Sequence, residues 1–294
     1  MLAGLARDGG LYVPESWPQF SPDDIRALSG LPYAEVALRV TQPFVGDAID
    51  AATYRGIIEA TYANFTHPAV APLKQFAPNL WLLELFHGPT LAFKDYAMQM
   101  LGNLFNHVLA SRGERVTIVG ATSGDTGSAA IEACKDREAI NVIILYPHNR
   151  VSEVQRRQMT TVGASNVHAL AVEGTFDDCQ AILKALFNDI AFRDEISLSG
   201  VNSINWARIL GQVVYYFTAA VALGAPDRKL SFAVPTGNFG NIYAGYVARR
   251  MGLPIDQLVL ATNANDILSR TLATGTMTRG EVVPSLSPSM DIQV

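Results

Sequence analysis

The sequence predicts an α/β protein in which parallel sheets are flanked by helices. From about residue 73 onward, short apolar runs alternate along the chain with stretches of helical periodicity. These runs are continuously apolar, which is typical of strands that are covered on both faces. Regular alternation of strand and helix favours parallel pairing, because each helix returns the chain to the edge where the next strand starts. The chain has 294 residues, enough for about two domains.

The first 72 residues are less regular than the rest. Prolines at positions 14, 18, 22, 32 and 43 interrupt them, and helical patterns occur only at 32–40 and 51–65. Beyond them, apolar runs predict strands at 79–86, 115–120, 141–146, 167–172, 230–235 and 257–262. The stretches between these runs predict helices at 90–110, 126–136, 151–162, 175–191, 206–223, 240–251 and 264–273. We therefore expect an irregular, partly helical N-terminal region followed by the α/β layers.

Composition excludes several classes of protein. Lys and Arg number 22 against 27 Asp and Glu, and no basic run occurs, so we expect no nucleic-acid partner. The most apolar stretch, 206–224, contains Arg208 and Gln212, which favours a buried helix over a membrane span. Two separated cysteines and a polar start of the chain favour a reducing, cytoplasmic setting without a signal peptide. The five histidines form no ligand pair, so no metal is expected.

Lys94 lies in the first of three loops that join a predicted strand to a helix. The loop reads Phe-His-Gly-Pro-Thr-Leu-Ala-Phe-Lys-Asp from residue 86, and Thr90 could cap the helix that follows. A cation in the first turn opposes the helix dipole, which disfavours the ammonium form of Lys94. A lysine that attacks a carbonyl group must be neutral. The sequence therefore suggests a nucleophilic amine, although a surface lysine beside Asp95 would fit the local pattern as well.

The other two loops are rich in small residues and resemble anion sites. Residues 120–127 read Gly-Ala-Thr-Ser-Gly-Asp-Thr-Gly, which matches neither the dinucleotide nor the Walker pattern. Residues 235–241 read Pro-Thr-Gly-Asn-Phe-Gly-Asn, with backbone donors suited to a phosphate. The alternatives are a turn capped by Asp125 or Thr126 in the first loop and a tight turn in the second.

Three further side chains are candidates near these loops. Asn205 and Arg208 stand at the start of the predicted helix 206–223, where an arginine could bind a phosphate or carboxylate through two hydrogen bonds. Arg208 could equally be a surface residue. His87 could donate a hydrogen bond in a site, although a structural role suits it better.

Together, these segments resemble threonine synthases of the bacterial and fungal branch. The matching segments are 9–14, 86–95, 120–130, 202–205, 237–241 and 287–294, in the family's order and over almost the whole chain. The resemblance implies the fold-type II architecture of pyridoxal-phosphate enzymes. It also implies a large domain of residues 73–96 and 197–294, a small α/β domain of residues 97–196, and an N-terminal domain of residues 1–72.

The resemblance assigns roles to the candidate residues. It implies that Lys94 binds pyridoxal 5′-phosphate covalently and is the catalytic acid and base. The loop that binds the cofactor phosphate is then Gly237, Asn238, Phe239, Gly240 and Asn241. The residues that face the substrate are Ser123, Gly124, Asp125 and Thr126, with Asn205 and Arg208 as candidates for the substrate phosphate. We expect Asp125 to cap its own helix, which would leave the backbone of 123–126 to the substrate.

The implied reaction converts O-phospho-L-homoserine, a small-molecule substrate, and water into L-threonine and phosphate. Two alternatives remain open at this point: a serine or threonine dehydratase-like lyase with the same cofactor, and a non-catalytic phosphate-binding module. Members of this branch continue well past the final matching segment, and the chain stops on an apolar run at 284–294. We therefore expect a fragment of a longer protein, whose site would be incomplete.

Overall fold

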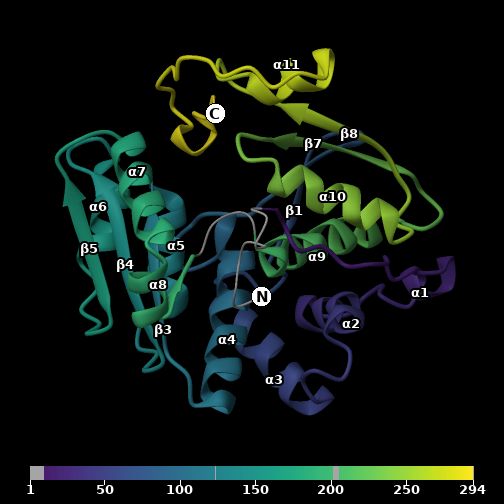
Figure 1. Cartoon of the computed structure of the whole chain (residues 1–294). Helices are drawn as coiled ribbons and strands as arrows, with labels where there is room; N and C mark the ends of the chain where they lie inside the picture. The colour runs from purple at the N-terminus through teal and green to yellow at the C-terminus, as the bar shows by residue number, and fades with distance from the viewer. Residues whose placement is uncertain (1–9, 123, 201–204, 294) are drawn as a thin grey trace. The chain divides into compact units, whose positions relative to one another are not determined.

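A computed structural model describes residues 10–122, 124–200 and 205–293 and confirms the α/β class with parallel sheets (Figure 1). The chain divides into two compact units. Unit 1 comprises Met1–Tyr12, Ala63–Thr66 and Phe86–Arg208. Unit 2 comprises Val13–Tyr62, His67–Leu85 and Ile209–Val294. The three-domain division expected from the sequence stays a prediction.

Unit 1 is built on a four-stranded parallel sheet in the order β5-β4-β3-β6. Its strands are β3 (Val116–Ala121), β4 (Ile140–Pro147), β5 (Val167–Val172) and β6 (Leu198–Ser199). Its helices are α4 (Lys94–Arg112), α5 (Asp125–Cys134), α6 (Glu153–Thr160), α7 (Phe176–Asn188) and α8 (Ile190–Glu195). Each pair of consecutive strands from β3 to β5 is joined by a helix, as the alternation predicts.

Helices cover both faces of this sheet, which explains its apolar strands. On one face, Val119 of β3 and Leu145 of β4 pack with Cys179 and Leu183 of α7. On the other face, a Cβ on Gly127 of α5 would lie 2.9 Å from Ile144 and 2.9 Å from Met159. Successive residues of β4 therefore face different helices. Because both faces of the strand are covered, neither face needs polar side chains.

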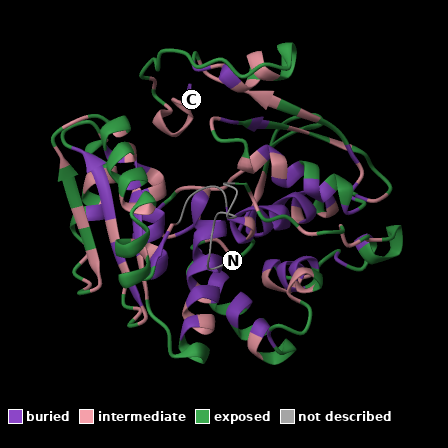
Figure 2. Cartoon of the chain, viewed as in Figure 1, coloured by how far each residue is buried: buried purple, intermediate pink, exposed green. Residues whose placement is uncertain are grey.

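Helix α4 is buried along most of its first three turns and packs closely against α5 (Figure 2). The contact is closest at Gly102, where a Cβ would lie only 2.3 Å from the carbonyl oxygen of Ala133. Only glycine allows the two helices to approach this closely. Gly102 thereby sets the distance between the helices whose first residues are Lys94 and Asp125.

Unit 2 combines a helical N-terminal part with a short parallel sheet. Its helices are α1 (Pro22–Arg26), α2 (Tyr33–Val45), α3 (Ala51–Tyr62), most of α9 (Trp206–Ala222), α10 (Gly240–Arg250), α11 (Ile267–Thr274) and the 3₁₀ turn η1 (Pro288–Met290). Strands β7 (Leu230–Pro235) and β8 (Ile255–Ala261) pair in parallel, and β1 (Leu73–Ala77) and β2 (Leu80–Leu83) form an antiparallel hairpin.

Helix α9 forms the core of unit 2. Its residues from Ile209 to Phe217 are nearly all buried, as expected for this apolar stretch. The N-terminal part contacts it through Phe20, whose ring centroid lies 5.2 Å from that of Phe217. Within the described ranges, no helix is both long and apolar enough to cross a membrane.

Several elements differ from the expected ones, for local reasons. The strand expected at 79–86 is the second half of a hairpin, and its first strand, β1, has the sequence Leu-Lys-Gln-Phe-Ala, which contains no continuous apolar run. The single helix expected at 175–191 is two helices, because the carboxylate of Asp189 accepts a hydrogen bond from the Phe192 N–H and caps a new helix. The two-residue strand β6 is too short to be recognised from composition.

We expect Gly102→Ala to lower the free energy of unfolding by about 1–3 kcal/mol, because the added methyl group forces α4 and α5 apart. The matched control is Gly56→Ala in α3, where a Cβ meets nothing within 4 Å. That change should stabilise the protein by about 0.5–1 kcal/mol, since alanine is the better helix residue. Urea unfolding of the three proteins measures both effects. Equal stability of the two variants would contradict the close helix contact.

Candidate functional site

Lys94 is a buried lysine at the very start of a helix. It is the first residue of α4, where Phe93 occupies the N-cap position without a capping side chain, and it is 6% exposed. The alternative of a surface lysine is therefore wrong. Burial and the positive end of the helix both act against the charged form of the amine.

The loop before Lys94 is held by Asp95 instead of by a helix cap. Its carboxylate is fully buried and accepts hydrogen bonds from the Thr90 N–H (2.9 Å) and the Thr90 hydroxyl (2.7 Å). The expectation that Thr90 caps the helix is wrong, because its side chain binds Asp95 instead. A Cβ on Gly88 would lie 2.5 Å from Asp95, so the loop closes tightly over this carboxylate. Gln158 of α6 donates a further hydrogen bond to the Thr90 carbonyl oxygen (2.9 Å).

Asp125 is the ionic partner of Lys94. Its Oδ1 accepts a hydrogen bond from the Lys94 Nζ at 2.7 Å, and the two side chains are 15% and 7% exposed. Asp125 is the first residue of α5, and its N-cap residue, Gly124, has no side chain that could cap the helix. The expectation that Asp125 caps its own helix is therefore wrong, because the carboxylate turns to the buried amine.

Burial and two neighbouring charged groups set the protonation state of the amine. Burial lowers the pKa of Lys94 below its ordinary value, the carboxylate of Asp125 raises it, and the guanidinium of Arg208 lowers it again. The net direction is down, which favours the neutral amine. Burial likewise lowers the pKa of Arg208 to about 10, while Asp125 acts in the opposite direction.

Arg208 is a buried residue of unit 1, only 3% exposed, so a surface position is excluded. A buried guanidinium that interacts with Asp125 is suited to binding an anion in this region. Asn205 is also buried, and its Oδ1 accepts a hydrogen bond from the Ala207 N–H (3.0 Å), so it caps the start of α9. The backbone carbonyl of His87 accepts hydrogen bonds from the N–H and hydroxyl of Thr66 (2.9 and 3.2 Å), and the structural role expected for its side chain stays a prediction.

The small-residue loop before α5 is organised by Thr122, which sequence reasoning missed. Its buried hydroxyl oxygen accepts hydrogen bonds from the N–H groups of Gly124 (3.0 Å) and Gly127 (2.9 Å). The expectation that the backbone of 123–126 is free for a ligand is thus wrong at Gly124. Thr126 lies in the first turn of α5, and Ser123 lies outside the described residues. A threonine between the end of a strand and a glycine is the signal that could have identified this role.

The second glycine-rich loop, in unit 2, leads from β7 into α10. A Cβ on Gly237 would lie 2.6 Å from the Met290 Cα, so glycine is required for the chain to pass there. Gly240 is the first residue of α10 and Phe239 its N-cap, while Asn238 precedes them in the loop. The first N–H groups of a helix have no partner within the helix, which makes this a suitable place for a phosphate.

The side chain of Asn241 is part of the packing in unit 2. Its Oδ1 accepts hydrogen bonds from the hydroxyl groups of Tyr215 (2.6 Å) and Tyr216 (3.0 Å) of α9. Asn241 can therefore offer a phosphate its backbone N–H, while its side-chain oxygen fastens the start of α10 to α9.

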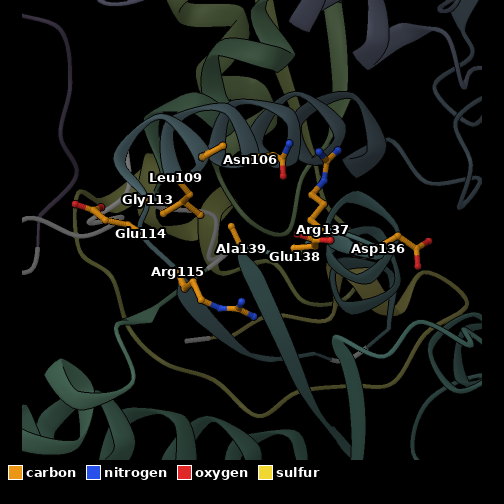
Figure 3. Close-up of a pocket in the computed structure, with 10 residues that line it drawn as sticks. Asn106, Leu109, Gly113, Glu114, Arg115, Asp136, Arg137, Glu138 and Ala139 are labelled. Carbon is orange, nitrogen blue, oxygen red and sulfur yellow. The ribbon is translucent and has the colours of Figure 1, made fainter.

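A pocket of about 560 Å³ lies at the other end of α4 in unit 1 (Figure 3). Acidic and basic side chains share its wall, among them Glu114, Arg115 and Arg137. Lys94 is separated from this end by the length of a 19-residue helix, about 27 Å. None of the predicted site residues lines this pocket.

Comparison with known proteins defines the family. Residues 66–294 match the model for "Pyridoxal-phosphate dependent enzyme", and residues 1–62 match "Threonine synthase N terminus". The chain belongs to the pyridoxal-phosphate dependent enzyme family. This membership confirms the predicted cofactor and the predicted fold-type II architecture.

Several similar proteins of high identity are threonine synthases, as the resemblance implies. One from Pseudomonas aeruginosa is 60% identical over the whole chain, which covers 63% of that protein. The structure of PLP-bound threonine synthase from Brucella melitensis is 63% identical with a TM-score of 0.95, covering 99% of this chain and 63% of that one. The yeast enzyme is 44% identical with a TM-score of 0.92, covering 99% of this chain and 60% of that one. The chain thus spans about three fifths of the length of these relatives.

The described residues fit the cofactor of this family. Pyridoxal phosphate needs an amine that can be neutral, and burial lowers the pKa of Lys94. It also needs a phosphate site, and the start of α10 offers backbone donors behind a glycine that a Cβ would block. The described residues therefore supply both groups that the cofactor requires, an amine and a phosphate site.

We expect Asp125→Asn to lower the pKa of Lys94 further, because it removes the negative charge that raises this pKa. The chain has only five lysines, so ¹³C-labelled lysine can be followed by NMR during a pH titration. The control is Asp177→Asn, the same change in the first turn of α7 on an exposed side chain, which should leave Lys94 unaffected. A Lys94 titration that is unchanged in Asp125→Asn would contradict the ion pair.

Proposed function

We propose that this chain carries the catalytic residues of a pyridoxal-phosphate dependent threonine synthase. The reaction converts O-phospho-L-homoserine and water into L-threonine and phosphate. The observation that carries the proposal is the buried amine of Lys94, whose hydrogen bond to Asp125 measures 2.7 Å, in a chain 60% identical to a threonine synthase. A cytoplasmic location remains a prediction from the sequence.

Lys94 is proposed as the residue that binds the cofactor covalently and moves protons. When bound, pyridoxal phosphate withdraws electrons from the substrate α-carbon, which makes loss of the α-proton feasible. A neutral amine can accept that proton, and its lowered pKa keeps the neutral form accessible. The same amine, once protonated, can return a proton later in the reaction.

Asp125 and Arg208 are proposed to assist the reaction in different ways, one as a negative and the other as a positive group. After Lys94 accepts a proton, the carboxylate of Asp125 stabilises the ammonium group through the existing hydrogen bond. The buried guanidinium of Arg208 is proposed to bind the phosphate or carboxylate of the substrate. Ser123, Gly124, Thr126 and Asn205 are proposed to line the substrate site, with the backbone of Gly124 and the side-chain oxygen of Asn205 already engaged.

The loop of Gly237, Asn238, Phe239, Gly240 and Asn241 is proposed to hold the cofactor phosphate. Support comes from the glycine at 237, the α10 N-terminus and the positive end of its dipole. Because the side chain of Asn241 binds two tyrosines, this role depends on backbone N–H groups.

A dehydratase-like lyase with the same cofactor is the nearest alternative. Relatives at 44–63% identity are threonine synthases, whereas a threonine deaminase structure is 15% identical with a TM-score of 0.52 and shows the fold alone. The higher sequence identity to threonine synthases therefore favours synthase activity over dehydratase activity.

Borohydride reduction in the presence of pyridoxal phosphate should leave a pyridoxyl adduct on the peptide that contains Lys94. Mass spectrometry identifies the peptide, and Lys94→Ala should abolish the adduct. The control is Lys184→Ala on the exposed face of α7, which should preserve it. An adduct on Lys74 or Lys184 in place of Lys94 would contradict the assignment, and no adduct at all would favour a non-catalytic phosphate-binding module.

The product assay separates the two enzyme classes. With O-phospho-L-homoserine the chain should release phosphate, and Lys94→Ala should slow this release by about 10²–10⁴-fold, because the general base is lost. With L-serine or L-threonine no ammonia should form. Ammonia from these substrates without phosphate from O-phospho-L-homoserine would identify a dehydratase.

A further inference from the structure

A dense polar cluster lies in unit 2 between the loop after β8 and the end of the chain. We name it the Asp291 cluster; it consists of Asn263, Asn265, Ser285, Ser287 and Asp291. None of these residues has been given a role above, although the sequence 287–294 contributed to the family resemblance.

The carboxylate of Asp291 is the centre of this cluster. Its Oδ1 accepts hydrogen bonds from Asn263 Nδ2 (2.8 Å), Asn265 Nδ2 (3.0 Å) and the Ser285 hydroxyl (2.6 Å). Its Oδ2 accepts one from the Ser285 N–H (2.8 Å). Four donors on one carboxylate fix both of its oxygens, and hydrogen bonds to a charged acceptor are the stronger kind. The hydrogen bonds from Ser285 therefore link the two ends of the turn 285–291, and those from Asn263 and Asn265 link the turn to the loop after β8.

Asn265 and Gln293 fasten the segment on either side of the turn. Asn265 is 2% exposed, its Nδ2 donates to the Val283 carbonyl oxygen (2.8 Å), and its Oδ1 accepts from the Val283 N–H (2.8 Å). Gln293 accepts a hydrogen bond from Arg270 Nη2 (2.9 Å), and its carbonyl oxygen accepts one from the Gly280 N–H (3.0 Å). The segment 283–293 is thus held at three places.

The segment held by this cluster contacts the glycine-rich loop that follows β7. Beside Asp291, the backbone of Ser289 and Met290 packs on Gly237, where a Cβ would be 3.0 Å from the Ser289 carbonyl oxygen and 2.6 Å from the Met290 Cα. Strands β7 and β8 pair up to Pro235 and Ala261, and the Thr236 N–H donates to the Ala261 carbonyl oxygen (2.8 Å). The loop from Gly237 therefore leaves the sheet beside the loop that carries Asn263 and Asn265.

We propose that Asp291 is a positioning residue that sets the conformation of the Gly237–Asn241 loop by holding the Ser289–Met290 backbone against Gly237. The inference rests on the proposed function, in which this loop binds the cofactor phosphate. Asp291 does not touch the phosphate. It restricts the loop from outside, so that the backbone N–H groups at the start of α10 keep one orientation before the cofactor binds.

The test is amide hydrogen exchange of the cofactor-free chain, compared between wild type and Asp291→Asn. Asparagine has nearly the same size but offers one acceptor oxygen, so either the Ser285 N–H or the donors on Oδ1 lose their partner. Exchange of the Thr236 and Tyr243 amides, which are hydrogen-bonded on either side of the loop, should become about tenfold faster, which corresponds to the loss of one hydrogen bond to a charged group. Exchange along α9 should stay unchanged, which verifies that the variant is folded.

Asp256→Asn is the matched control, because Asp256 is an exposed aspartate on β8 outside the cluster, and it should leave exchange of the Thr236 and Tyr243 amides unaltered. If Asp291→Asn does not fold, Ser285→Ala decides the question, since it removes the hydroxyl that donates to Asp291 Oδ1. Exchange of the Thr236 and Tyr243 amides that equals wild type in the folded variant overturns the proposal.

A second measurement separates this inference from the proposed function. The wild-type chain is titrated with pyridoxal phosphate and with pyridoxal, which lacks the phosphate. Tighter binding of pyridoxal phosphate by wild type, reduced about tenfold in Asp291→Asn with pyridoxal unaffected, is the expected result. Equal binding of the two compounds by wild type would refute the phosphate role of the loop, whereas a wild-type preference that Asp291→Asn retains in full would refute only the role of Asp291.

Discussion

A buried amine at the positive end of a helix is the constraint around which unit 1 is organised. Lys94 opens α4 in a place where both burial and the helix dipole disfavour its charge. Such a group needs a nearby carboxylate whenever it holds a proton, and Asp125 supplies one at 2.7 Å. The carboxylate comes from the first residue of the neighbouring helix, so the ion pair depends on how closely α4 and α5 pack.

Residues around the Lys94–Asp125 ion pair hold the two side chains in position. Gly102 lets α4 approach the backbone of α5, and Gly127 leaves room for Ile144 and Met159 against the start of α5. The loop before Lys94 is closed by Asp95, and Gln158 of α6 holds its Thr90 carbonyl oxygen. The amine of Lys94 is therefore positioned by residues from three helices, as its proposed catalytic role requires.

The two glycine-rich loops are fixed in their conformations by different contacts. In unit 1, the hydroxyl of Thr122 binds two backbone N–H groups and so determines the shape of the loop before α5. In unit 2, no comparable side chain lies within the Gly237 loop; the backbone of Ser289 and Met290 packs against it instead, and we propose that Asp291 holds this backbone in place. Under the proposed function this loop presents its N–H groups to a phosphate, so side chains within the loop cannot also bind these groups, and the support has to come from outside.

The sequence by itself determined the fold class, the family and the identity of the candidate loops. Continuous apolar runs between helical stretches are a local property of the chain, and so are the glycines and the lysine that follow the strands. Only the tertiary structure decided which partner each side chain takes. Thr90 and Asp125 both looked like helix caps, because capping is the best local use of such residues, yet Thr90 binds Asp95 and Asp125 binds Lys94, 31 positions away in the chain. Contacts such as Met290 on Gly237 join residues more than fifty positions apart, and their geometry depends on how strands and helices pack, which local sequence patterns do not contain.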